Sequence, residues 1–407
     1  MKIAYICMQF PAPSETFASH DVRTLEKLGA EVSVYCMRGP HEKYSSLVLE
    51  RDLQRIPISH AASNVIFPFF ESLFLSPKLF AHLFFQCWKL LYRRPIVLLK
   101  SLCLIPRSIE IFHEVLKFKP DMLHLFWGHF PSLVGLLFLK TDPSQKISVF
   151  LGAYDLELRY PFSEIVGNAA QSVWTHSKSN LPALEALGIA SSKIRVAYRG
   201  VDIARLDLPP AEKVNGSIVS GGRLIGSKRF DLVLSVVEKL YHQRASVSLK
   251  MFGEGEEKVS LQTLAKKLQL EGVVQFLGHV DQGRVMKELA SAQIFLFFST
   301  YGGERLPNIV KEAMLHGCLC FVSRSTGIEE LIESGKDGFI LDSSDPREIS
   351  EFICRVLSDE LLVRNVRREA RKKILENFRV ETSVGFMYET WRSSLSQDGK
   401  REVVSGG

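Results

Sequence analysis

The sequence predicts an α/β protein built from two doubly wound domains, each with a parallel sheet. Two stretches of the chain alternate short apolar segments with segments of helical period, and the pair Pro209-Pro210 separates them. Of the 407 residues, 46% are hydrophobic and 24% are charged, which is the balance of an ordinary globular protein. This composition excludes a disordered, collagen-like or disulfide-dense chain, and it supplies enough apolar residues for two cores.

The first stretch begins with a predicted strand over residues 3–8 and a helix over 17–28 that Gly29 ends. A second strand over 31–36 completes a strand–helix–strand unit, which is typical of a parallel sheet. The same rhythm resumes after Pro120. There we expect strands over 122–126, 146–151 and 172–176, and helices over 132–139 and 178–187.

The second stretch repeats this pattern after residues 201–216, which lack periodicity and are expected to form a linker. The expected strands are 217–221, 247–252, 273–277, 294–298 and 318–322, and the helices between them are 230–241, 261–268, 283–290 and 307–316. We therefore place an N-terminal domain over residues 1–200 and a C-terminal domain over 217–378. A final helix over 379–395 is expected to return toward the N-terminal domain, and the tail beyond 396 is expected to fray.

The cysteines and the N-terminus point to the cytoplasm. Seven Cys stand at irregular spacings without a C-x-x-C pair, so we expect reduced thiols and no zinc site. The first apolar stretch is short and lacks a small-residue cleavage site, so it is interpreted as a strand and not as a signal peptide. The net charge of +6 fits nucleic acid, an anionic membrane surface or phosphorylated ligands equally well.

Residues 65–107 combine nine aromatic residues with six Lys or Arg, against the single acid Glu71. Uncharged apolar runs stay well short of the ~18 residues of a membrane span. One predicted helical face carries Lys78, His82, Gln86, Lys89 and Arg93, and the other carries Phe80, Phe84, Trp88 and Leu91. The helix could pack on its own domain. Its joint enrichment in basic and aromatic residues favours the alternative, a helix lying on an anionic bilayer.

The most specific motif is the segment that runs from Tyr301 to Met314, directly after a predicted strand. Pro307 opens a helix there without losing a hydrogen bond. The free N–H groups of Asn308, Ile309 and Val310 can then bind anionic oxygens. Glu304, in the loop, can accept hydrogen bonds from sugar hydroxyls, and Glu312, eight residues further on, can reach a ribose diol. The alternative is that both glutamates are ordinary surface residues.

A second motif runs from Ser220 to Phe230, where a strand enters a loop that contains Gly222. Arg223 can bind phosphate oxygens in a bidentate manner, and Lys228 supplies a compact charge. Two fixed cations over a diphosphate would stabilise it as a leaving group, whereas a solvated basic loop is the simpler alternative. The later turn at Gly253, within Phe252-Gly253-Glu254-Gly255, is a weak signal and is interpreted as a tight turn on the nucleotide side.

The order of these motifs, followed by Thr326-Gly327-Ile328-Glu329-Glu330-Leu331, resembles that of the retaining glycosyltransferases of family 4. The segments 10–17 and 199–202 resemble a subgroup that builds bacterial exopolysaccharides such as colanic acid. The resemblance implies a GT-B fold, in which two Rossmann-like domains face a central cleft. It also implies roles for the following residues: Arg223 and Lys228 on the donor diphosphate, Glu304 on the transferred sugar, Glu312 on the ribose, and Leu306, Pro307, Asn308 and Ile309 around phosphate and sugar.

The N-terminal half matches the family more loosely. Leu151-Gly152 stands where the family usually has His-Gly, and Arg305 follows Glu304 where many members have Gly. His129 matches a second family histidine on the acceptor side, although a histidine among aromatic residues is often structural. The expected acceptor-side residues are Glu15, Thr16, His129 and Asp155.

The resulting hypothesis is a retaining glycosyltransferase that uses a nucleotide-diphosphate sugar and a glycan or polyprenyl-diphosphate-linked oligosaccharide acceptor. No D-x-D motif occurs in the chain, so we expect metal-independent catalysis without a cofactor. Peripheral attachment to the inner face of the cytoplasmic membrane is expected, and nucleic-acid binding is not. Two alternatives stay open, namely a GT-B sugar-nucleotide epimerase and a catalytically silent nucleotide-sugar-binding subunit.

Overall fold

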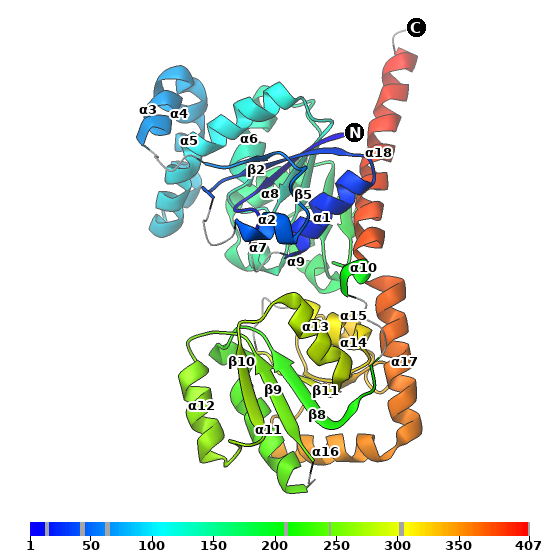
Figure 1. Cartoon of the computed structure of the whole chain (residues 1–407). Helices are drawn as coiled ribbons and strands as arrows, with labels where there is room; N and C mark the ends of the chain where they lie inside the picture. Colours follow the sequence, from blue (N-terminus) through cyan, green and yellow to red (C-terminus); the bar gives the residue numbers. More distant parts are fainter. Residues whose placement is uncertain are drawn as a thin grey trace. The chain divides into compact units, whose positions relative to one another are not determined.

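The computed structural model describes residues 1–407 except 13–15, 41–44, 62–65, 207–210, 244–245, 301–304 and 406–407. For residues 66–69, 71, 205–206 and 397–405 it describes the backbone alone. The chain forms two compact units (Figure 1). Unit 1 consists of Met1–Tyr198 with Val380–Gly407, and unit 2 consists of Arg199–Arg379. Each unit contains one fully parallel sheet between helices, which confirms the predicted pair of doubly wound domains.

Unit 1 contains a seven-stranded sheet in the order β3-β2-β1-β4-β5-β6-β7. Its strands are β1 (Lys2–Cys7), β2 (Glu31–Cys36), β3 (Ile58–Ser59), β4 (Met122–Phe126), β5 (Ile147–Phe150), β6 (Ser172–Thr175) and β7 (Ile194–Val196). Its helices are α1 (Thr16–Lys27), α2 (Ser46–Glu50), α3 (Ile66–Leu75), α4 (Pro77–Leu91), α5 (Pro95–Phe118), α6 (Ser132–Thr141), α7 (Ala153–Leu158), α8 (Pro161–Ala169), α9 (Leu181–Ala186) and α18 (Val380–Ser405). All five residues of β4 are buried, as expected for a parallel strand that is covered on both faces.

Unit 2 contains a six-stranded sheet in the order β10-β9-β8-β11-β12-β13. Its strands are β8 (Val214–Gly221), β9 (Ser248–Phe252), β10 (Val274–Gly278), β11 (Ala292–Phe297), β12 (Leu319–Ser323) and β13 (Phe339–Leu341). Its helices are α10 (Ile203–Leu206), α11 (Phe230–Gln243), α12 (Lys258–Lys267), α13 (Gln282–Ser291), α14 (Asn308–Leu315), α15 (Ile328–Leu331), α16 (Pro346–Ser358) and α17 (Glu360–Asn377).

The chain enters unit 2 after Tyr198 and leaves it after Arg379, and we call these two points the chain crossings. The segments of unit 2 at the two crossings lie next to each other. The backbone N–H of Val201 donates to the carbonyl of Phe378 at 2.8 Å, and Val201 pairs with Arg379 in a short parallel bridge. Residues 201–216, expected as a linker, therefore contain ordered elements, because α10 and the first residues of β8 fall within that range. The missing hydrophobic period reflects the shortness of α10 and the exposure of the start of β8.

The C-terminal helix α18 completes the core of unit 1. Trp391 is almost fully buried, its indole N–H donates to the hydroxyl of Ser148 at 3.1 Å, and its ring centroid lies 5.0 Å from that of His124. The same cluster of buried side chains includes Val380, Val384 and Met387 of α18 together with residues of β1 and β2. The helix extends to Ser405, beyond the predicted end at residue 395.

The aromatic and basic segment forms α3, α4 and the first half of α5. Leu83, Cys87 and Leu91, at spacings of four residues, are fully buried in the core of unit 1. The predicted division of the α4 faces was therefore wrong for Leu91, which faces the core, while Phe84 and Trp88 are exposed. Among the described residues, none of the helices is long and apolar enough to cross a membrane.

Candidate active site

In unit 2 the predicted phosphate-binding residues follow two adjacent strands where the strand order reverses. β8 is the first strand of the unit, and it lies between β9 and β11. The loops after β8 and β11 therefore start at neighbouring carboxyl ends and lead to helices on opposite sides of the sheet. This switch point is the place where open α/β sheets bind their ligands. Gly222, Arg223 and Lys228 follow β8, and Leu306 to Ile309 follow β11.

The loops after β8 and β9 are joined backbone to backbone. The N–H of Gly222 donates to the carbonyl of Phe252 at 3.1 Å, and that of Leu224 donates to the carbonyl of Glu254 at 3.0 Å. Gly253 has a φ of +128°, and a Cβ atom there would lie 1.8 Å from the carbonyl oxygen of Gly222. Only glycine permits this approach. Gly253 thus has a structural reason for its place beside the predicted phosphate loop.

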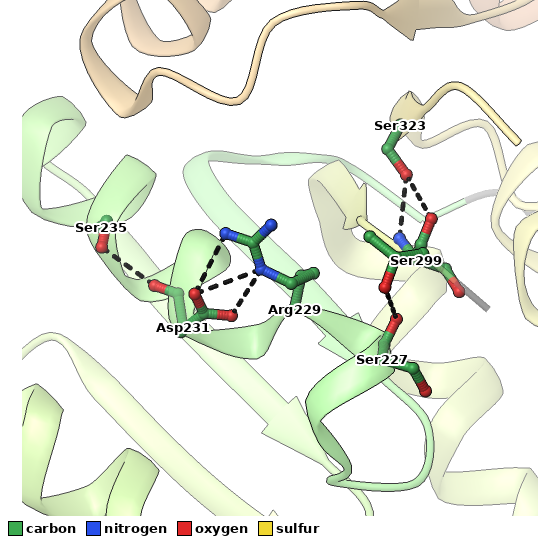
Figure 2. Close-up of polar contacts among 7 residues, drawn as sticks. Ser227, Arg229, Asp231, Ser235, Ser299 and Ser323 are labelled. Atoms are coloured by element: carbon green, nitrogen blue, oxygen red, sulfur yellow. Dashed lines mark hydrogen bonds and ion pairs between the residues drawn. The ribbon is translucent and has the colours of Figure 1, made fainter.

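The three cations of this loop are held differently. Arg223 is exposed, whereas Lys228 is buried, with its ammonium 4.8 Å above the centre of the Phe297 ring. Arg229 has its side chain turned to Asp231, and its Nε lies 3.1 Å from that carboxylate (Figure 2). The pair fixes the start of α11. Of the two adjacent cations, Arg229 is thus engaged with Asp231, and Lys228 is buried against Phe297.

Further bonds attach this loop to the ends of β11 and β12. The backbone N–H of Thr300 donates to the carbonyl of Ser227 at 2.8 Å. The hydroxyl of Ser323 accepts from the N–H of Ser299 at 2.9 Å and donates to its carbonyl at 3.1 Å (Figure 2). These bonds connect the loop that carries Lys228 to Ser299 and Thr300, which follow β11. Glu304 itself lies outside the described residues.

The helix α14 begins where the motif predicted, at Pro307 and Asn308. Leu306 and Pro307 are buried, and Asn308 and Ile309 are partly exposed. The prediction of three free N–H groups was wrong for Val310, because its N–H donates to the carbonyl of Pro307 at 3.2 Å. Proline has φ near −65°, so Pro307 starts the first turn early and supplies this acceptor. The first N–H groups of a helix have no partner within the helix, so those of Asn308 and Ile309 are the donors that this helix start can offer to a ligand.

Glu312 and Lys311 are adjacent buried ionisable residues on α14. Lys311 is fully buried, and its ammonium donates to the carbonyl of Arg199 at 2.7 Å and to Oδ1 of Asn308 at 3.1 Å. Burial raises the pKa of Glu312 to about 7, and the amide of Gln282 donates to its Oε1 at 3.4 Å. Burial also lowers the pKa of Lys311 to about 7. The carboxyl of Glu312 is thus poised between its neutral and ionised forms.

Lys311 and Gln282 were not found from the sequence. A lysine that stands next to a glutamate in a helix is usually a solvated residue, and the burial of Lys311 depends on a carbonyl 112 residues away. Lys311 also lies 5.6 Å from the centre of the Phe378 ring, so it contacts both chain crossings. It links the first turn of α14, through Asn308, to the chain segments that enter and leave unit 2.

In unit 1 the acceptor-side candidates follow β1, β4 and β5, around the corresponding switch point between β1 and β4. The carboxylate of Asp155 accepts three bonds, from the N–H of His129 at 3.1 Å, from its Nδ1 at 2.9 Å and from the N–H of Gly152 at 2.9 Å. Asp155 therefore joins the loops after β4 and β5 and orients the His129 ring. With Nδ1 facing the carboxylate, Nε2 is the nitrogen available to a ligand.

Two further positions bear on this side. Leu151, which stands where a histidine was expected, is fully buried, and a Cβ on Gly128 would lie 2.0 Å from its side chain. Leu151 therefore belongs to the core. Thr16 is the first residue of α1, and the next residue, Phe17, packs against Trp127 at a centroid distance of 5.9 Å, so α1 starts beside the loop after β4. Glu15 lies outside the described residues.

Comparison with known proteins gives the following similarities. Residues 210–373 match the family model of glycosyl transferases group 1. WcaL of Escherichia coli, named as a colanic acid biosynthesis glycosyltransferase, is 29% identical over 204 residues, which are 48% of this chain and 50% of that protein. WcaL of Salmonella typhimurium is 24% identical over 93% of this chain and 96% of its own length. The match thus spans half of the first relative and nearly all of the second.

Among solved structures, the Anabaena protein HepE in complex with UDP and glucose is similar in fold. The likeness has a TM-score of 0.71 at 17% identity, and it covers 97% of this chain and 100% of HepE. It confirms the predicted GT-B class of two Rossmann-like domains. The similarity to both WcaL proteins confirms the predicted resemblance to exopolysaccharide glycosyltransferases.

Proposed function

Because residues 210–373 match the model of the glycosyltransferase group 1 family, we propose that this chain is a retaining glycosyltransferase of family 4 that uses a nucleotide-diphosphate sugar. The acceptor in this proposal is a glycan or a polyprenyl-diphosphate-linked oligosaccharide of a bacterial surface polysaccharide. The observation that carries it is the set of cations and first-turn N–H groups at the switch point of unit 2, with Lys228 buried beside Phe297. The complex of HepE with UDP and glucose makes UDP sugars the first donors to test.

The proposed reaction breaks the bond between the anomeric carbon and the diphosphate, and the acceptor oxygen attacks the same face. Lys228 and Arg223 bind the leaving diphosphate together with the N–H groups of Asn308 and Ile309. The departing phosphate takes the proton of the acceptor hydroxyl, so neither an added base nor a metal ion enters the scheme. Glu304 binds the transferred sugar and Glu312 the ribose diol.

On the acceptor side, His129 binds an acceptor hydroxyl through Nε2, and Asp155 acts as a positioning residue for it. Thr16, the first residue of α1, and Glu15, which precedes it in the sequence, complete the proposed acceptor set. The start of α1 beside the loop after β4 supports the assignment of Thr16. A lipid-linked acceptor would be met at the inner face of the cytoplasmic membrane, where we place the protein as a peripheral protein.

The proposed function is tested first by ligand binding and then by transfer. A nucleotide sugar present at 100 times its dissociation constant should stabilise the protein by about 2.7 kcal/mol, so UDP, GDP and dTDP sugars are compared by thermal shift. With the donor found, nuclear magnetic resonance of the product should show that the anomeric configuration is kept, at a rate that EDTA leaves unchanged. Inversion, or a rate that requires added magnesium, contradicts the proposed mechanism. A product formed from the donor alone indicates an epimerase, and binding without turnover indicates a silent subunit.

Binding of a nucleoside diphosphate should strengthen as the pH rises toward 7 and then level off. Glu312 must be ionised to accept hydrogen bonds from the ribose, and burial holds its pKa at about 7 in the free protein. Well below pH 7, each further pH unit should therefore weaken binding by about tenfold. Isothermal titration between about pH 5 and pH 8 measures this dependence. The Glu312→Gln variant is the control, since it retains the ionisation of the phosphate and removes that of the carboxyl. An equal slope in both proteins excludes Glu312 from the ribose site.

A further inference from the structure

The aromatic and basic segment of unit 1 has an outward surface that the sheet does not cover. We define the aromatic patch as Phe84, Phe85, Trp88 and Tyr92 on α4 and its end, with Ile96 and Leu99 in the first turns of α5. Their exposed fractions run from 38% for Phe84 to 70% for Ile96. Figure 1 shows α3 and α4 at the outer edge of unit 1, away from the strands. An exposed apolar surface of this kind marks a site of interaction.

The patch is held rigidly, because the opposite face of α4 is part of the core. Leu83, Cys87 and Leu91 are fully buried there, and α4 packs along α5. Two ring contacts lie on the helix, between Phe80 and Phe84 and between Phe84 and Phe85, with centroids 6.5 and 6.0 Å apart. The helix α4 is thus packed on its domain, and its aromatic residues are nevertheless exposed. One face of α4 is buried in the core, and the exposed aromatic residues lie on a different face.

Cations flank the patch on one side. At 100° per residue, Phe84, Trp88, Tyr92 and Phe85 cover one arc of α4, and Lys78, Lys89 and Arg93 cover the next arc, all of them exposed. The sequence contains no Asp or Glu from Ser72 to Ile109. Arg94, the residue after Arg93, donates to the carbonyls of Leu158 and Arg159 at 2.9 and 3.0 Å and is not counted with these cations. Lys78, Lys89 and Arg93 therefore have no Asp or Glu within residues 72–109 of the sequence.

We propose that this surface docks the protein on an anionic lipid bilayer, with the aromatic patch in the interface and Lys78, Lys89 and Arg93 on the lipid head groups. A rigid apolar stripe with a basic flank is the pattern of an interfacial helix. The absence of acids from residues 72–109 argues for an anionic partner, and the mixture of aromatic rings and cations suits the head-group region. Docking would bring unit 1 to a lipid-linked acceptor, and this use rests on the proposed function. The proposal that the surface binds anionic lipid does not depend on that function.

Vesicle flotation with the full chain, without donor or acceptor, tests the surface. Phosphatidylcholine vesicles with phosphatidylglycerol should bind the protein at low salt, and those without it should not. High salt should release the protein, since the screening length falls from about 10 Å at 0.1 M to about 3 Å at 1 M. The Lys78→Glu, Lys89→Glu, Arg93→Glu variant should bind about a hundredfold more weakly, at about fivefold per cation. The Phe85→Ser, Trp88→Ser variant should lose on the order of tenfold or more.

A matched control replaces three exposed cations of unit 2, as Lys266→Glu, Lys267→Glu and Arg364→Glu. It lowers the net charge by the same amount, and it should float like the wild type. Trp88 also reports insertion directly, because it is the exposed one among four Trp, with Trp174 and Trp391 buried and Trp127 partly so. Anionic vesicles should shift the tryptophan emission to the blue, and Trp88→Phe should abolish the shift while retaining flotation.

The results separate this proposal from the function. The docking proposal is overturned if both triple variants lose vesicle binding equally. It is also overturned if the wild type does not bind anionic vesicles. The wild type could instead sediment as a dimer and fail to bind vesicles, while the Phe85→Ser, Trp88→Ser variant is monomeric. That result would contradict docking on a bilayer and show that the patch binds a second copy of the chain. Nucleotide binding in unit 2 should be the same in every variant. Flotation without any nucleotide binding would contradict the proposed function and leave the docking surface standing.

Discussion

Replacing Lys228 by Met should reduce kcat by about 10²–10³-fold while the protein stays folded. A preorganised donor aimed at developing charge is worth that much in a water-excluded site. Lys228 is preorganised because it is buried and its ammonium lies over the Phe297 ring, whereas Arg223 is exposed and must be ordered by the ligand. The methylene chain of Met preserves the packing on Phe297. Steady-state kinetics with saturating donor and acceptor give the measurement.

The neighbouring cation provides the control for this experiment. Arg229 is turned to Asp231, so Arg229→Met should leave kcat close to that of the wild type and cost only a little stability at the start of α11. Arg223→Ala should act mainly on affinity, by about 1.5–3 kcal/mol, as expected for one lost charge-assisted hydrogen bond. If Lys228→Met and Arg229→Met have equal kcat values, Lys228 does not bind the diphosphate in the transition state.

Replacing Trp391 by Ala should destabilise unit 1 by about 3–5 kcal/mol. The indole is almost fully buried, touches the rings of His124 and Trp174 and donates to the hydroxyl of Ser148 at 3.1 Å. Its removal leaves a cavity at the sheet and takes one of three hydrogen bonds from the hydroxyl of Ser148, which keeps those to His124 and Ser172. Thermal unfolding is the measurement. Because the chain has two units, we expect one of two transitions to fall in temperature while the transition that responds to nucleotide stays in place.

Two further variants serve as controls for Trp391→Ala. Trp391→Phe keeps a ring in the core and loses the hydrogen bond, so its destabilisation should be well below that of Trp391→Ala. Trp88→Ala removes the same side chain from a site that is 58% exposed, and it should change the free energy of unfolding by no more than about 0.5 kcal/mol. An equally small effect of Trp391→Ala would show that α18 does not stabilise unit 1.

The sequence predicted the central strands well because parallel strands buried on both faces form short apolar runs, as in β4 and β11. It missed β3, β7 and β13, which have two or three residues each. Strands of that length carry no measurable period, and their positions are set by pairing with a neighbour already in the sheet. The same limit applies to α10, which was assigned to a linker.

At the candidate site, the sequence located the helix start at Pro307 and the cations of the β8 loop, because turn residues and proline leave local signals. It could not locate Lys311, whose partners are the carbonyl of Arg199 and the ring of Phe378. It also grouped Leu91 with the exposed aromatic residues of α4, whereas Leu91 is buried with Leu83 and Cys87. The contacts of Lys311 come from residues far along the chain. For α4, a helical period shows that a face is apolar without showing which element covers it.

The discontinuity of unit 1 determines the order in which a ribosome can complete the two folds. Unit 2 is one unbroken segment, so all of its strands have been synthesised once residue 379 has left the exit tunnel. Unit 1 at that moment still lacks Val384, Met387 and Trp391, which belong to its buried cluster. Domains usually mature in the order of their synthesis. Here the half encoded first has to wait as an incomplete intermediate with exposed apolar side chains, and the half encoded second reaches its native core before it.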